Sequence, residues 1–194
     1  QHVDVFPKNK EVYVYKNRNM NYAGKMRAGI MNLFTNYDQH LKFQYDNFKV
    51  YCDSVDYIQF VPRRHPRYNY ASDAELDLFE ALKKLRIEGV RGAVYINRPN
   101  NKSGLKKLPE YPVFDCYTES YKYWSDTTDY NDGVYTREKM KFRLDPFVVD
   151  SLEDFNLRNL EFHGEFDCSE IMPAFRDTLK PVRDNTYGLR EKMP

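Results

Sequence analysis

Hydrophobic and polar positions alternate with two different periods along this 194-residue chain. Between Met26 and Phe48, apolar residues recur every three or four positions, which is the spacing of one face of an α-helix. The pattern predicts a long amphipathic helix at residues 23–49, although Gly24 and Gly29 weaken its first turns.

A strand–helix–strand unit is predicted at residues 55–97. Residues 55–61 and 90–97 are rich in β-branched and aromatic residues, which is typical of strands. Between them, a capping box begins at Ser72 and an apolar stripe at helical spacing continues until Gly89, which should end the helix. A strand, a helix and a strand within about 45 residues indicate a parallel pair with a right-handed crossover.

A β-hairpin with a wide turn is predicted at residues 117–144, because two alternating segments flank a run of turn-forming Asp, Thr, Asn and Gly residues. Together these elements predict an α+β (mixed α/β) fold with a small mixed sheet of three to five strands. We expect one globular domain at residues 21–180. An N-terminal arm or edge strands (1–20) and a polar C-terminal tail (181–194) would form extended terminal arms.

The amino-acid composition limits the classes of protein to which this chain can belong. The chain has 30 basic and 29 acidic residues, a net charge of +1, which argues against a strongly basic nucleic-acid binder and against an acidic disordered tail. No apolar run reaches the length of a transmembrane segment. The 17 tyrosines and 13 phenylalanines suit a surface that contacts other proteins or stacked bases, or a core and shell that are rich in tyrosine.

The cysteines and histidines do not form a recognisable site. Cys52, Cys116 and Cys168 are odd in number and have no paired spacing, so we expect reduced, buried thiols, with one disulfide plus a free thiol as the alternative. His163 and Glu165 have the His-x-Glu spacing of zinc deaminases but lack the Pro-Cys-x-x-Cys that completes such a site. With no glycine-rich phosphate loop and no nucleophile motif, we predict no metal, no cofactor and no catalytic residues.

One basic and aromatic segment between the strand at 55–61 and the capping box is the candidate contact site. Arginine side chains bind phosphates and tyrosine rings stack on bases, so the segment could contact RNA or a partner protein. The candidate residues are Arg63, Arg64, His65, Arg67, Tyr68 and Tyr70.

The function predicted from these features is that of a non-catalytic structural or interaction subunit of a large multi-protein assembly. The terminal arms and the proline-rich loop at 98–115 have no composition that would order them alone, so neighbouring subunits are expected to hold them. An RNA-contacting protein of a ribonucleoprotein, acting through residues 63–70, is the alternative, and an enzyme without a short motif is the second alternative. The chain opens with Gln1 rather than Met, so we expect either that a leader sequence was removed or that the start was trimmed. A mitochondrial location is favoured over secretion.

Overall fold

The computed structural model of the chain describes residues 3–6, 11–14, 20–35, 41–61, 86–123, 139–156, 159–168, 172–181 and 187–189. The regular secondary structure of these residues is almost entirely antiparallel β-strand. The strands are β1 (Val3–Phe6), β2 (Glu11–Val14), β3 (Met20–Tyr22), β4 (Gly24–Ala28), β5 (Met31–Thr35), β6 (Leu41–Gln44), β7 (Lys49–Phe60), β8 (Arg86–Tyr95), β9 (Val113–Cys116), β10 (Ser120–Tyr123), β11 (Lys141–Leu144), β12 (Phe147–Val149), β13 (Phe162–Cys168), β14 (Met172–Pro181) and β15 (Tyr187–Leu189). A short 3-10 turn, η1 (Pro99–Asn101), follows β8.

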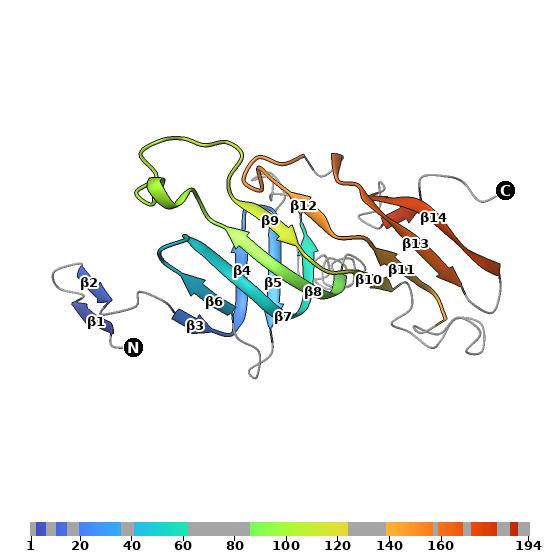
Figure 1. Cartoon of the computed structure of the whole chain (residues 1–194), viewed down its shortest axis with the longest axis horizontal. Helices are drawn as coiled ribbons and strands as arrows, with labels where there is room; N and C mark the ends of the chain where they lie inside the picture. The colour runs from blue at the N-terminus through green and yellow to red at the C-terminus, as the bar shows by residue number, and fades with distance from the viewer. Residues whose placement is uncertain are drawn as a thin grey trace, which may run out of the picture.

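Strands β3 to β15 form one sheet, while β1 and β2 pair only with each other (Figure 1). Two branches of the sheet share the long strands β7 and β8. The short branch has the order β3-β6-β7-β8-β9-β12, and the long branch has the order β4-β5-β7-β8-β10-β11-β13-β14-β15. A single antiparallel hairpin of long strands therefore carries both branches.

The two branches diverge because β7 and β8 are irregular at their centres. The pairing of β7 with β8 shifts register between Cys52 and Val55, and Gly89 of β8 has a φ of +69°. A bulge of this kind bends a strand and increases its twist, and a glycine tolerates the left-handed backbone at no steric cost. The half of β7 before the bend pairs with β6, and the half after the bend pairs with β5.

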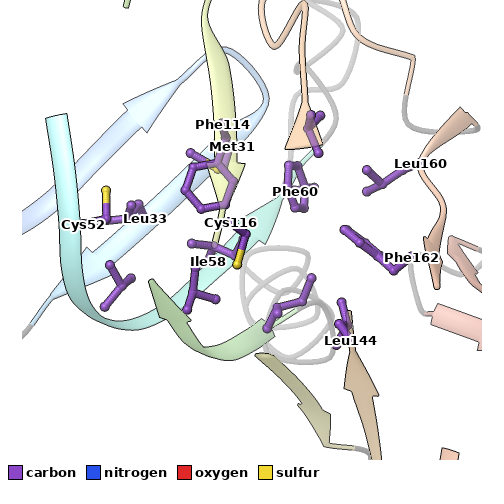
Figure 2. Packing of buried hydrophobic residues seen from close by; sticks show 14 of the residues in the cluster. Met31, Leu33, Cys52, Ile58, Phe60, Phe114, Cys116, Leu144, Leu160 and Phe162 are labelled. Carbon is purple, nitrogen blue, oxygen red and sulfur yellow. The ribbon is translucent and has the colours of Figure 1, made fainter. Parts of the chain in front are cut away.

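The core lies where the two branches face each other. Phe60 of β7 packs against Phe162 of β13 with ring centroids 5.8 Å apart, and Phe162 packs edge-on against Phe147 of β12 at 4.8 Å. Phe147 in turn contacts Phe114 of β9 at 6.0 Å. Figure 2 shows Phe60, Phe114 and Phe162 together with buried aliphatic side chains from both branches. These aromatic contacts join strands of the short branch to strands of the long branch.

The predicted helix at 23–49 is wrong, because the described residues of this segment, 23–35 and 41–49, form β4, β5, β6, two turns and the start of β7. Gly29, with a φ of +55°, turns the chain back so that β4 and β5 pair, and Met26 lies opposite Leu33. The seven-residue spacing of these two side chains therefore reflects a hairpin with one apolar face, not two turns of a helix. Buried residues of β5 alternate with half-buried ones, as expected for a strand with one core face.

The parallel pair predicted at 55–97 is also wrong, since β7 and β8 pair antiparallel along most of their length. Gly89 lies inside β8 and does not end a helix, and β8 begins at Arg86, within the predicted helical stripe. The rest of the predicted helix, with the capping box at Ser72, lies outside the described residues. A connection of more than twenty residues permits either strand direction, so local patterns could not decide between them.

The strand pairing of the hairpin predicted at 117–144 is confirmed, because β10 and β11 pair antiparallel, with Ser120 opposite Leu144 and Tyr123 opposite Lys141, while its wide turn lies outside the described residues. The predicted α+β class and small mixed sheet are wrong, because thirteen of the fifteen described strands build one antiparallel sheet. In the predicted C-terminal tail, β15 pairs with β14. Among the described residues, no helix has the length and apolarity needed to cross a membrane.

The loop at 98–115, which we expected a partner to hold, makes hydrogen bonds within its own chain. Asn101 is buried, and its side chain donates to the Asn97 side chain at 3.0 Å and to the Lys106 carbonyl at 2.8 Å. Its amide oxygen also accepts a hydrogen bond from the Lys106 backbone nitrogen at 3.0 Å. Arg98 and Glu110 form an ion pair at 3.0 Å across the loop. These hydrogen bonds and this ion pair hold the loop in place through contacts within the chain.

Candidate functional site

The basic and aromatic segment predicted from the sequence, residues 63–70, lies outside the described residues. Its contact with RNA or with a partner therefore stays a prediction. The described residues instead offer a different cluster of tyrosines and charges, on the outer face of the short branch.

This cluster follows from the register of three adjacent strands. Lys49 of β7 lies opposite Tyr95 of β8, and Tyr51 lies opposite Ala93. Ala93 in turn lies opposite Asp115 of β9. Because opposed residues and residues two apart share one face of a sheet, these side chains gather on one surface. The intervening residues Val50, Cys52, Val94, Phe114 and Cys116 are buried on the core side.

We call Lys49, Tyr51, Tyr95, Asp115 and Tyr117 the tyrosine face. The Lys49 ammonium lies 4.3 Å from the centroid of the Tyr51 ring and 5.1 Å from that of Tyr95, within the range of a cation–π contact. The hydroxyls of Tyr95 and Tyr117 are 3.5 Å apart. Ala93 is fully covered by its neighbours, whereas Tyr117 is 45% exposed. Ala93 therefore forms the floor of the face, between Tyr51 and Asp115.

The electrostatics of the tyrosine face reflect partial burial and mutual contact. Burial lowers the pKa of the Lys49 ammonium, but hydrogen bonding and electrostatic interaction with Tyr51 and Tyr95 outweigh it, so the pKa is raised. Burial raises the pKa of the Asp115 carboxyl, an effect that the nearby Lys49 charge opposes. Burial, with a contribution from the Tyr95 hydroxyl, raises the pKa of Tyr117 above its usual range. The face therefore presents the charged Lys49 ammonium beside a Tyr117 phenol that stays neutral at neutral pH.

The outer face of the long branch is built differently, because its polar residues are paired with one another across the strands. Phe34 stacks on Tyr57 at 4.4 Å, and Arg143 pairs with Glu165 at 3.0 Å. One row of opposed residues crosses eight strands and contains three aromatic rings and five charged side chains. Its members are Lys25, Phe34, Tyr57, Glu88, Tyr121, Arg143, Glu165 and Arg176.

His163, which the sequence analysis compared with a zinc-deaminase motif, makes a cross-strand contact. His163 of β13 lies opposite Thr178 of β14, and its Nδ1 is 3.0 Å from the Thr178 hydroxyl. In the part of the chain that the structure describes, no group of three His, Cys, Asp or Glu side chains could hold a metal ion. The pair is a cross-strand hydrogen bond at the sheet surface.

The structure places all three cysteines as free, buried thiols. Cys52 and Cys116 lie in one row on the core side, with Gly92 of β8 between them. Burial raises the pKa of the Cys52 thiol to about 12, and burial also raises the pKa of the Cys116 and Cys168 thiols. Such thiols are poor nucleophiles and poor metal ligands at neutral pH.

Cys52 should accordingly resist alkylation in the folded protein. Because each pKa unit changes the thiolate fraction about tenfold near pH 8, a shift from 9.0 to about 12 predicts labelling roughly 1,000-fold slower than for an exposed cysteine. Mass spectrometry after iodoacetamide treatment would measure the rate, and three labels should appear once urea unfolds the chain. The raised folded-state pKa also means that the stabilising contribution of the neutral thiol is present below pH 9.0 and is lost towards pH 12. Rapid labelling of Cys52 at pH 8 would contradict its burial.

Sequence reasoning missed the tyrosine face. The sequence does contain a signal for it, because Lys49 and Tyr51 alternate with Val50 and Cys52, which is typical of a strand with one solvent-exposed face. The helical spacing at 23–49 obscured this alternation. No protein-family model, curated protein or solved structure matches this chain.

Proposed function

We propose that this chain is a non-catalytic interaction subunit that binds another protein of a larger assembly through its tyrosine face. The observation that carries the proposal is the grouping on one outer surface of Tyr51 and Tyr95, from the paired strands β7 and β8, with Tyr117, which directly follows β9. Tyrosine is enriched at the centres of protein interfaces because it offers a large apolar area, a polar end and few rotatable bonds.

Two further features support this choice of surface. Val148 of β12 lies opposite Asp115 and is 63% exposed, so the tyrosine face continues into an apolar side chain at the edge of the short branch. The strands beneath are held in a continuous sheet, so the rings are fixed before a partner arrives. Binding by a preorganised surface loses little conformational entropy.

The test is to follow the full chain in extracts of the cells that make it, by sedimentation and native mass spectrometry. The chain should travel in a particle larger than a monomer. The double variant Tyr95→Ala and Tyr117→Ala should weaken that association by roughly 30-fold or more, the loss expected when an interface loses a main contact residue.

Tyr121→Ala is the matched control, because Tyr121 is a half-buried tyrosine on the outer face of the long branch. It should leave the particle intact, and circular dichroism would check that each variant is folded. A wild-type chain that is monomeric in those extracts, or a particle unaffected by the double variant, would overturn the proposal.

A further inference from the structure

The loop between β8 and β9 projects beyond the ends of both strands and carries a strongly exposed apolar residue (Figure 1). Leu105 is 89% exposed, more than any other large hydrophobic residue that the structure describes. Its neighbours Ser103, Gly104, Lys106 and Lys107 are exposed as well. Single exposed leucines are common on protein surfaces, so the loop becomes informative only through the features that accompany Leu105.

The first of these features is that the backbone is held on both sides of Leu105. The Gly104 nitrogen donates a hydrogen bond of 3.0 Å to the Asn101 carbonyl. The Asn101 side chain also bonds to both the nitrogen and the carbonyl of Lys106. Leu105 is therefore presented to solvent by an ordered turn, and little conformational entropy would be lost when this part of the loop binds a surface.

The second feature is an excess of positive charge around Leu105. Between Arg98 and Glu110 the loop has four basic residues and one acidic residue, a net charge of +3. Glu110 already pairs with Arg98 at 3.0 Å. No described residue forms an ion pair with Lys102, Lys106 or Lys107. Three lysine charges therefore remain available beside one apolar side chain.

We propose that this loop binds the surface of an anionic lipid bilayer, with Leu105 inserted among the acyl chains and the three lysines at the headgroups. Lysines near an anionic surface and an apolar side chain inserted below it both contribute to binding. A protein partner fits less well, because lysine is depleted at interface cores and leucine is rare among the residues that dominate binding. RNA would contact the lysines but leave Leu105 without a contact. The inference goes beyond the proposed function and does not depend on the tyrosine face.

Co-sedimentation of the full chain with lipid vesicles tests the choice of partner. The partition coefficient should be at least about tenfold higher for phosphatidylcholine vesicles containing phosphatidylserine than for pure phosphatidylcholine vesicles, and it should fall as salt is added. Absence of binding, or equal binding to the neutral vesicles, would overturn the proposal. Binding to single-stranded RNA without binding to anionic vesicles would overturn it in favour of a nucleic-acid contact.

Two variants test the apolar and the charged part of the loop. Leu105→Ala should lower the partition coefficient about tenfold, because it removes apolar groups that would enter the bilayer. Lys107→Gln should lower it about fivefold. Lys25→Gln is the matched control for the charge, since Lys25 is an exposed lysine of β4, outside the loop, and its loss should change binding by less than about twofold. An equal loss in Lys107→Gln and Lys25→Gln, or none in Leu105→Ala, would overturn the proposal.

A fluorescent label shows which part of the chain enters the bilayer. An environment-sensitive dye on Leu105→Cys reacts selectively, because the three native thiols are buried. Its emission should shift to the blue when vesicles containing phosphatidylserine are added. The same dye on Ala174→Cys is the control, since Ala174 is exposed on β14, at the opposite end of the sheet (Figure 1). An equal shift at both positions, or a chain that sediments with vesicles without a shift at position 105, would overturn the proposal.

Discussion

Replacing Gly29 with alanine is expected to destabilise the protein by roughly 2–5 kcal/mol, through steric overlap and backbone strain together. A Cβ at this position would lie 1.9 Å from the Leu152 carbonyl oxygen, and Gly29 has a φ of +55° that disfavours any side chain. The same carbonyl accepts a hydrogen bond of 2.9 Å from the Ile30 nitrogen. The overlap would therefore push the β4–β5 turn away from the segment that follows β12.

Gly104→Ala separates the two contributions. Gly104 has a φ of +68°, but no atom lies within 4 Å of the position its Cβ would take, so only backbone strain of about 1–2 kcal/mol is expected there. Urea denaturation of both variants gives the comparison. If Gly29→Ala costs no more than Gly104→Ala, the close approach of the turn to Leu152 does not exist in solution.

Phe162→Ala is expected to cost about 3–5 kcal/mol, the usual range for a buried phenylalanine. Phe162 of β13 is buried and contacts both Phe60 and Phe147, so its loss leaves a cavity between the two branches. The aromatic contacts on both sides of the ring would be lost together, which increases the effect beyond that of the buried area alone.

Leu105→Ala is the control for truncating a large apolar side chain to alanine on the surface. Leu105 is 89% exposed in the loop after β8, so its truncation should change the free energy of unfolding by no more than about 0.5 kcal/mol. Denaturant titration followed by circular dichroism measures both variants. A cost below about 1 kcal/mol for Phe162→Ala would show that the two branches do not share one core.

The tyrosine face shows how far a sequence can locate the surface that we propose for binding. The abundance of tyrosine indicated a surface for partners, and the strand expected at 90–97 already contained Tyr95. Which tyrosines meet was set by the pairing of β7 with β8 and of β8 with β9, which brings Tyr51 and Asp115 to either side of Ala93. These residues are more than 60 positions apart in the chain, and no local pattern records their register.

The sequence by itself determined which short segments prefer an extended backbone, because that preference depends on neighbouring side chains. The expected strands at 55–61 and 90–97 overlap β7 and β8, and β10 and β11 pair inside the hairpin predicted at 117–144. Only the tertiary structure decided the antiparallel direction of β7 and β8. It also decided that the described residues of the segment at 23–49 form strands and not a helix. Strand pairing and core packing stabilise residues that are distant in sequence, and their summed free energy exceeds the small differences in local helix and strand propensity.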